Sequence, residues 1–422
     1  MLSQEENELI TRVGPGTPMG AALRRYWLPA LLVEELPAPD CPPVRVRLLG
    51  EDLVAFRDSM GQLGLLGAHC PHRGASLFFG RNEECGLRCV YHGWKFDVAG
   101  ACVDMPSEPE ESSFKHKIRH TAYPCVEKGG VIWTYMGPPA EQPPLIDLEW
   151  MRAPAGHCHV SKTYEECNYL QALEGGVDTA HSSFLHRMMN PSARTDRATE
   201  RYRARAVAPK LEALVTDYGF TYAGIRSLPD DGTRYVRVYQ FVMPFHQMRA
   251  YEGYAGRPLI QGHMWMPIDD EQTWVYNWMY VRDGSALTPE EIRAEETETG
   301  RAADDLLPGY RLKRNRSNDY LIDRQEQRTT SWTGIQGVNT QDIAIQESMG
   351  PIYDRTREHL GASDLAVITT RRLLLQAARD AAAGREPLGV RSSAQSVRPA
   401  EMILPEGVPW PEAMKEELLV RW

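Results

Sequence analysis

Two short segments of the chain each bring a cysteine and a histidine together. One is Cys70-Pro71-His72, the other is Cys89-Val90-Tyr91-His92, and residues 73–88 lie between them. Thiolate and imidazole groups are ligands of soft and borderline transition metals. Both segments can therefore supply ligands to one metal centre, and such a centre constrains the fold because two loops must converge on it.

The order of these ligands distinguishes an iron–sulfur cluster from zinc. A Rieske [2Fe–2S] cluster has two thiolates on one iron and two imidazoles on the other. Zinc accepts the same four ligands, but zinc modules usually present a pair of cysteines and then a pair of histidines. Gly74 and Gly93 come just after the histidines and permit tight turns beneath a cluster. The pattern predicts a Rieske cluster with the ligands Cys70, His72, Cys89 and His92.

Length, charge and cysteine content exclude several other classes of protein. At 422 residues the chain can bury two domain cores, and 47 basic against 57 acidic residues give a net charge of −10, which disfavours nucleic acid as a partner. Eight cysteines, two of them needed as thiolates, do not make a secreted disulfide framework, and His69 and Cys85 are interpreted as ordinary loop residues. The start MLSQEENELI has no signal-peptide pattern, and no segment reaches the roughly 20 apolar residues of a membrane span. We therefore expect a cytoplasmic protein that binds no membrane.

The chain divides into two predicted domains. From about residue 27 to 138, short runs such as VRVRLL and GVIWTYM are rich in β-branched and aromatic residues, which is typical of a small all-β domain. The Pro-rich segment 137–148 is the predicted linker. Residues 1–26 and 139–422 then form the second domain, and the expected fold class is α+β.

The second domain is expected to contain an antiparallel sheet flanked by helices. Alternating segments such as YVRVYQFVM and TWVYNWMYVRD lie between residues 214 and 283, and helical patterns precede and follow them. The chain also begins with a helix, because Ser3 and Glu6 form a capping box before Leu9 and Ile10. Residues 284–336 are charged and interrupted. Within them, PEEIRAEETETGRAADDL has a helical pattern, and the rest favours no single assignment.

A second set of potential metal ligands occurs at Asp178, His181 and His186. On a regular helix Asp178 and His181 share a face, whereas His181 and His186 point about 140° apart. A helix that directs both histidines at one ion must therefore end or distort near Ser182 and Ser183. Two such histidines are commonly solvated or core residues, but a Rieske cluster needs an electron acceptor, and iron held by two histidines and a carboxylate is a suitable one.

Two longer segments carry a resemblance to a known family. CPHRGASLFFGRNEECGLRCVYHGWKFDVAG begins at Cys70, and NYLQALEGGVDTAHSSFLH begins at Asn168. They resemble the Rieske non-haem iron aromatic-ring oxygenases, and most closely the phthalate dioxygenase-like group. The resemblance extends over most of the chain, from GPGTPMG near residue 14 to QDIAIQES and DRTREHLGASD near residues 341–364. It implies an oxidoreductase that uses a [2Fe–2S] cluster, a mononuclear Fe(II) and O₂.

The resemblance also implies the ligands of the mononuclear iron. It selects His181, His186 and, as the carboxylate, Asp342 in NTQDIAIQES. Glu347 is the alternative carboxylate. The acidic residues interpreted as helix-surface or capping groups are Asp354 and Asp364.

Asp178 has a separate expected role. In the resembling enzymes the cluster of one subunit approaches the iron of a neighbour in a homotrimer, and a carboxylate between a cluster histidine and an iron-bound histidine joins the two sites. Such a carboxylate also fixes the tautomers of both imidazoles. The alternatives for Asp178 are a third iron ligand or a helix-surface acid. Glu174 and Asn168 lie on the approach to the same site and are expected to support it by hydrogen bonds.

The reaction implied by the resemblance is oxygenation of an aromatic substrate. The chain has no GxGxxG in a βαβ context, so a separate NAD(P)H-dependent flavin or iron–sulfur reductase is expected to supply the electrons. The expected reaction is cis-dihydroxylation of a phthalate-like aromatic acid, and O-demethylation of a methoxylated aromatic acid is the alternative. Rivals from other classes are a Rieske electron-transfer protein, which would lack the His/His/Asp set, and a zinc-binding structural protein.

An aromatic acid requires a cationic partner in its pocket. A buried carboxylate is costly without one, and arginine binds it through two parallel hydrogen bonds. Arg226, Arg237 and Arg249 lie in or beside the predicted sheet, where the resemblance puts the pocket, although each is alternatively an exposed strand residue. Residues expected to add apolar lining, with structural core as the alternative, are Tyr222, Phe241, Met243 and Phe245.

Overall fold

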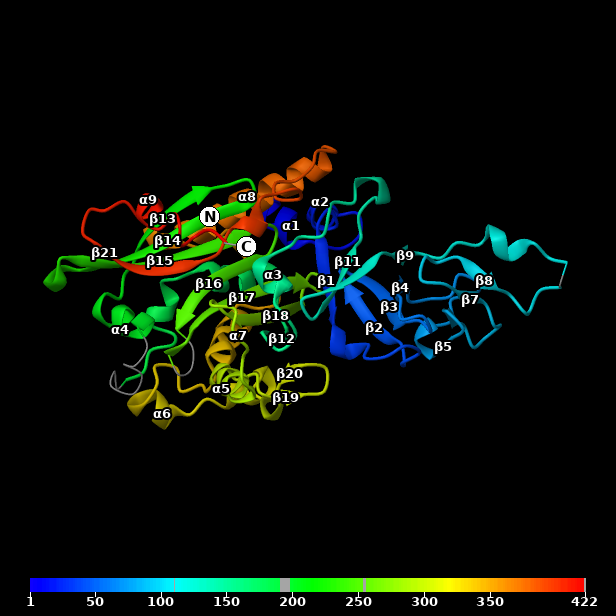
Figure 1. Ribbon diagram of the computed structural model, residues 1–422, viewed down its shortest axis with the longest axis horizontal. Coiled ribbons are helices and arrows are strands. Elements are labelled where there is room, and N and C mark those ends of the chain that lie inside the picture. The colour runs from blue at the N-terminus through cyan, green and yellow to red at the C-terminus, as the bar shows by residue number, and fades with distance from the viewer. Residues whose placement is uncertain (110, 190–197, 253–255, 421–422) are drawn as a thin grey trace.

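Two bodies of different composition lie along the long axis of the computed structural model, a smaller β-rich one and a larger mixed one (Figure 1). The structure describes every residue except 110, 190–197, 253–255 and 421–422. The helices are α1 (Gln4–Thr11), α2 (Pro18–Leu23), α3 (Tyr169–Val177), α4 (Ala198–Arg205), α5 (Pro289–Thr299), α6 (Arg324–Thr329), α7 (Val338–Ser348), α8 (Leu365–Ala382) and α9 (Trp410–Ala413).

The strands of the smaller body form two four-stranded sheets, in the orders β2-β3-β4-β9 and β5-β6-β7-β8. Part of their apolar side chains, among them Val54, Phe56, Leu87 and Phe96, form one core. This body contains both Cys/His segments, and the predicted all-β character is confirmed. The strands are β2 (Val44–Leu48), β3 (Glu51–Arg57), β4 (Leu63–Gly67), β5 (Arg81–Glu83), β6 (Gly86–Arg88), β7 (Lys95–Phe96), β8 (Cys102–Asp104) and β9 (Ala122–Tyr123).

A third sheet, in the order β1-β11-β10, joins the two bodies. Its strands are β1 (Trp27–Leu32), β10 (Cys125–Lys128) and β11 (Val131–Tyr135), and every residue of β1 and β11 is buried. Trp27 and Trp133 belong to the large core that also contains Trp150 and Tyr276. Sheet β2-β3-β4-β9 also contributes to this large core, through Leu48, Leu53 and Leu65 among others, whereas the described residues of β5-β6-β7-β8 do not.

The larger body is built on one sheet with the order β13-β14-β15-β16-β17-β18-β12-β20-β19, and β21 pairs with the first half of β15. All pairs are antiparallel except β12 with β20. The expected antiparallel sheet flanked by helices is confirmed. The strands are β12 (Cys158–Glu165), β13 (Lys210–Val215), β14 (Gly219–Leu228), β15 (Thr233–Val242), β16 (His246–Glu252), β17 (Pro258–Pro267), β18 (Thr273–Val281), β19 (Leu306–Leu307), β20 (Arg311–Leu312) and β21 (Ala400–Pro405).

Helix α3 packs closely on the sheet and on α7. A β-carbon on Gly176 would lie 2.0 Å from the Trp265 ring on β17, and one on Gly175 would lie 2.1 Å from Gln346 Nε2 on α7. Both positions therefore require the absence of a side chain. This contact brings the end of α3 beside α7, where the second set of predicted metal ligands lies.

The first helix begins as the sequence predicts. The Ser3 hydroxyl accepts a hydrogen bond from the Glu6 N–H, and the Glu6 carboxylate accepts one from the Ser3 N–H. The helical pattern that begins at Pro289 is confirmed by α5. The remainder of residues 284–336, which the sequence left without an assignment, contains the short strands β19 and β20 and helix α6.

Candidate metal centres and substrate pocket

Two loops of the same shape bring the four predicted cluster ligands together. The N–H groups of Gly74 and Gly93 donate to the carbonyls of Cys70 and Cys89, each at 2.9 Å. Both glycines have left-handed backbones, with φ of +75° and +79°, which a β-carbon would strain. The two turns therefore require glycine, as the sequence predicts.

The ligand side chains fit a cationic cluster. Cys70 and Cys89 are buried, and the rings of His72 and His92 lie 4.4 Å apart between centroids. Burial raises the pKa of the Cys70 thiol to about 11, and the neighbouring Cys89 adds to the rise. A buried thiol with a raised pKa stays protonated unless a metal stabilises its thiolate.

The same four residues do not fit a single zinc ion. Zinc binds sulfur at about 2.3 Å and nitrogen at about 2.0–2.1 Å, so its ligand atoms crowd together. In the part of the chain that the structure describes, the only three or more potential ligand atoms that all lie within 4.8 Å of one another belong to His181, His186 and Asp342. The Cys/His set is spread more widely, which suits a cluster of two irons.

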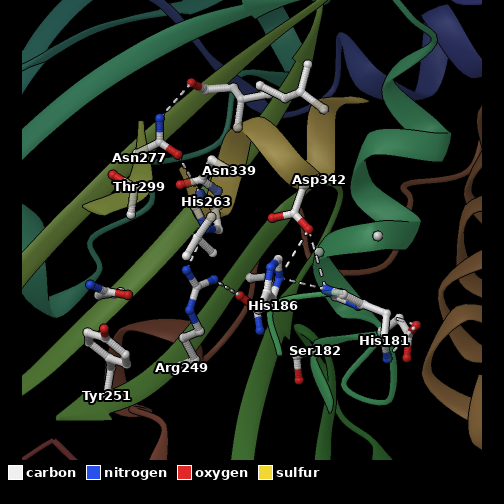
Figure 2. A pocket seen from close by; sticks show the side chains of 18 of the residues that line it. His181, Ser182, His186, Arg249, Tyr251, His263, Asn277, Thr299, Asn339 and Asp342 are labelled. Carbon is white, nitrogen blue, oxygen red and sulfur yellow. Dashed lines mark hydrogen bonds and ion pairs between the residues drawn. The ribbon is translucent and has the colours of Figure 1, made fainter. Parts of the chain in front are cut away.

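The second set of ligands meets at the end of α3 and the start of α7. His181 Nε2 lies 3.3 Å from His186 Nε2, and Asp342 Oδ1 lies 3.5 Å from the first and 3.3 Å from the second. Nitrogen and oxygen ligands about 2.1 Å from a shared metal ion have similar separations. Figure 2 shows the three side chains converging from two elements of the fold.

Neighbouring residues orient the two imidazoles. His186 Nδ1 lies 2.8 Å from Gln341 Oε1, and the Gln341 amide donates to the Ile335 carbonyl, so Nδ1–H donates to Gln341 and Nε2 is left for a metal. Asp178 Oδ2 lies 3.4 Å from His181 Nδ1 but does not form a hydrogen bond with it. A hydrogen-bonded partner such as Gln341 fixes the tautomer and the direction of a metal-binding histidine.

The geometry between the histidines differs in detail from the expected one. The sequence predicts a distortion near Ser182 and Ser183, whereas α3 already ends at Val177 and a 3-10 turn spans His181–Ser183. Arg226 holds this turn, because its Nη2 donates to the Thr179 carbonyl and to Ser183 Oγ. The two histidines can point at one site because a regular helix does not connect them.

The alternative carboxylates lie elsewhere. Glu347 is on α7, but its carboxylate accepts hydrogen bonds from the Glu166 N–H at 2.8 Å and from the Tyr320 hydroxyl. Asp354 accepts from the Thr356 N–H, and Asp364 accepts from the Gly361 N–H before α8. Asp364 has the capping role that the sequence predicts, whereas Asp354 closes a turn outside any helix.

Glu174 and Asn168 do not support the site in the expected way, because neither lines the pocket. Glu174 points to the other side of α3, where it forms ion pairs with Arg355 and Arg371. Asn168 caps the N-terminus of α3 and donates to the carbonyls of Thr11 and Asp270. Both residues fix α3 in the fold rather than act at the reacting centre.

A cavity of about 140 Å³ opens beside the three converging side chains. This size is close to the roughly 150 Å³ of an engineered cavity that binds benzene, so one aromatic ring fits. The sheet supplies its wall from alternate residues of five strands, as the period of two in a strand requires. These residues are Thr163 and Glu165, Arg237 and Tyr239, Gln247, Arg249 and Tyr251, Gln261, His263 and Trp265, and Val275 and Asn277.

The three predicted arginines have different surroundings. Arg226 and Arg237 are buried, so the alternative of exposed strand residues is wrong for both. Arg226 holds the turn described above, and Arg237 donates to the Ala250 carbonyl and lies 3.6 Å from the Glu401 carboxylate. Arg249 points into the cavity (Figure 2) and donates to His263 Nε2 at 2.7 Å and to Gln247 Oε1 at 3.4 Å.

The aromatic and apolar residues expected to line the pocket belong to the core instead. None of the four borders the cavity, and all are buried in the large core. Phe241, for example, packs against Phe220, with 5.1 Å between ring centroids. The structural core, which was the alternative for these residues, is therefore correct for Tyr222, Phe241, Met243 and Phe245.

Models of known families match both parts of the chain. The Rieske [2Fe-2S] domain matches residues 26–122, and the LigXa C-terminal domain like family matches residues 134–418. Together with the fold, these matches define the class as oxygenases with a Rieske domain.

Relatives of known activity specify the family. The chain is 42% identical to the phthalate 4,5-dioxygenase oxygenase subunit of Pseudomonas putida, over 93% of this chain and 90% of that one. It is 38% identical to the 3-chlorobenzoate-3,4-dioxygenase oxygenase subunit of Comamonas testosteroni, over 99% of each. The 5,5'-dehydrodivanillate O-demethylase oxygenase subunit of Sphingobium sp. is 34% identical, over 92% and 84%. The chain therefore belongs to the family of Rieske oxygenase subunits, which use a [2Fe–2S] cluster, mononuclear iron and O₂.

A solved structure has the same fold. Dicamba monooxygenase bound to dicamba matches with a TM-score of 0.60 and 18% identity, over 86% of this chain and 99% of that one. Within the described residues, no helix combines the length and the apolar character that crossing a membrane requires.

Proposed function

We propose that this chain is the oxygenase component of a system that dihydroxylates a phthalate-like aromatic acid. The [2Fe–2S] cluster is held by Cys70, His72, Cys89 and His92, and the mononuclear iron by His181, His186 and Asp342. The iron, when bound, supplies the activation of O₂. Electrons come from a separate NAD(P)H-dependent reductase.

The proposed class of substrate rests on the position of Arg249. Its guanidinium lines the cavity beside the iron ligands, and it forms no ion pair with any carboxylate of the described residues. Burial lowers the pKa of Arg249 to about 10, and nearby Arg237 lowers it further, so the group is still cationic at neutral pH. A cation without a counter-ion, beside a cavity of one-ring size, suits a carboxylate ligand. The relatives named for phthalate and 3-chlorobenzoate support the same class of substrate.

Replacing Arg249 with alanine tests this choice. A buried charge pair that loses one partner costs roughly 2–5 kcal/mol, so the KM for an aromatic acid should rise about 30-fold or more. Arg249→Lys should recover only part of the loss, because an ammonium group lacks the planar pair of donors. The steady-state KM for members of a panel of phthalates and methoxybenzoates is the measurement, and products identified in the same assays separate dihydroxylation from O-demethylation.

The control for this experiment is the charge of the substrate. The methyl ester of the same acid should lose little affinity in the Arg249 variant, because no carboxylate is left unpaired. Arg237→Ala should cost less than Arg249→Ala, since Arg237 already has Glu401 nearby. Near-normal KM values for every acid in the alanine variants of Arg226, Arg237 and Arg249 would make a neutral aromatic the better substrate.

The role proposed for Asp178 is electron transfer between subunits of a homotrimer. Its carboxylate contacts His181 on one side and is 21% exposed, so a cluster histidine of a neighbouring subunit could reach it. Figure 1 supports transfer between chains, because β5–β8 lie at one end of the molecule and α3 and α7 lie well inside the other body.

Asp178→Asn should slow electron transfer without removing either metal. The amide is nearly isosteric, but it cannot accept from two imidazole N–H groups as a carboxylate does. We expect re-oxidation of the reduced cluster, in the presence of substrate and O₂, to slow by on the order of 10- to 100-fold. Single-turnover stopped-flow absorption measures it. Asp354→Asn, the same change in an exposed turn, should leave the rate unchanged. Normal re-oxidation or lost iron in Asp178→Asn would contradict the bridging role.

A further inference from the structure

Two consecutive hydrogen bonds connect Arg249 to Asn277 through His263. His263 Nδ1 lies 2.7 Å from Asn277 Oδ1, and Arg249 Nη2 lies 2.7 Å from His263 Nε2. The three residues come from the neighbouring strands β16, β17 and β18, and Figure 2 shows them in one row. His263 pairs directly with Asn277 and with Gln247, which lies two residues before Arg249 on the same face. The register of three strands therefore builds this row.

The direction of each hydrogen bond is fixed. Asn277 Nδ2 donates to the Val275 carbonyl at 3.2 Å, so its Oδ1 faces His263 and only accepts. His263 therefore carries its proton on Nδ1 and presents a lone pair at Nε2 to Arg249. Burial lowers the pKa of His263 well below its usual value, and nearby Arg249 and Arg301 lower it further. The imidazole stays neutral and remains an acceptor.

A neutral acceptor has a different effect on arginine from that of a carboxylate. A carboxylate behind Arg249 would form an ion pair with it and offset its charge, which would weaken its attraction for a substrate anion. The imidazole fixes the direction of the guanidinium without adding a negative charge next to it. The two bonds to His263 and Gln247 use two of the five guanidinium donors, so enough remain to bind a carboxylate in the cavity.

We infer that His263 and Asn277 are positioning residues that orient Arg249 toward the carboxylate of an aromatic acid while leaving its positive charge available to that substrate. The inference rests on the proposed function, because it requires that Arg249 binds the acid. It gives a structural reason for two polar residues in the wall of the cavity that touch no metal ligand.

Two replacements of His263 distinguish a role in orienting Arg249 from a role in filling space. Glutamine can put an acceptor oxygen where Nε2 lies. Asparagine reaches only as far as Nδ1 and removes this acceptor, which leaves Arg249 with the longer bond to Gln247 alone. Calorimetric titration of the iron-loaded holoenzyme with phthalate should give a Kd about tenfold higher for His263→Asn than for the natural protein, which is about 1.4 kcal/mol. For His263→Gln the rise should be about threefold or less. Dimethyl phthalate should bind all three proteins equally.

The outcomes distinguish this inference from the proposed function. Equal phthalate affinity in the two His263 variants would overturn the inference. Asn277→Leu is a second test, because it removes the acceptor that fixes the tautomer, and a phthalate Kd equal to that of the natural protein would also overturn it. If Arg249→Ala leaves phthalate binding unchanged, the proposed role of Arg249 in substrate binding fails, and the inference fails with it. If Arg249→Ala weakens binding and His263→Asn does not, only the role of His263 fails.

Discussion

Replacing Asp342 with alanine is expected to remove the mononuclear iron and abolish oxygenation while the [2Fe–2S] cluster persists. The carboxylate is one of three groups that converge within 4.8 Å, and two imidazoles alone bind iron weakly. Burial raises the pKa of Asp342, but His186 and His181 outweigh it and lower the pKa well below its usual value, so the group is an anion at every relevant pH. Iron counted per subunit, together with the cluster absorption and product formation, measures the result.

Glu347→Gln is the matched control for this experiment. Glu347 lies on the same helix as Asp342, but its carboxylate accepts hydrogen bonds from Tyr320 and from the Glu166 N–H and does not contact the histidines. We expect the Glu347 variant to keep its mononuclear iron. An Asp342 variant with full mononuclear iron, combined with iron loss in the Glu347 variant, would reverse the assignment of the carboxylate ligand.

Replacing either cluster histidine should abolish oxygenation as completely, because it removes the [2Fe–2S] cluster rather than the mononuclear iron. In His72→Ala or His92→Ala the second iron of the cluster loses one of its two imidazoles. We expect the Rieske absorption and EPR signals to disappear and turnover to stop, because electrons no longer enter the protein. His69→Ala, beside the motif but outside its spacing, should retain both signals. Unchanged EPR spectra in both the His72 and His92 variants would refute the cluster assignment.

The groups that could be predicted from the sequence are those that lie close together along the chain. Each Cys/His loop is a local unit whose turn is closed by its own glycine, so its sequence is sufficient to predict it. Asp178, His181 and His186 are equally local. Asp342 is far from them along the chain, and only the resemblance to a family indicated it.

The residues that sequence reasoning missed depend on packing between distant segments. Gln341 orients His186 across 155 positions of the chain, and no local pattern shows that contact. His263 and Asn277 are polar residues at alternate positions of β17 and β18, and that alternation was visible. Their partnership with Arg249 needs the register of β16, a strand that the sequence did not reveal.

The burial of the arginines was missed for a related reason. A strand with alternating polar residues normally has one face in water. Here the polar face of the sheet is covered by α3, α7 and the cavity, so Arg237 is enclosed although its sequence neighbours suggest exposure. The role expected for Glu174 was wrong for a different reason. Its place in the motif does not show which side of α3 its side chain faces.

The shared core limits where segments can be exchanged between relatives. A chimera cut at residues 27 and 138 would transplant Trp27 and Trp133 away from the Trp150 and Tyr276 with which they form one core. Cuts between β1 and β2 and between β9 and β10 would leave these tryptophans in place, but would still separate Leu48, Leu53 and Leu65 from the same core. Recombination that preserves folding therefore requires matched side chains on β2–β4 and on the catalytic body at either pair of cuts, although the β-rich stretch of sequence suggests a separable unit.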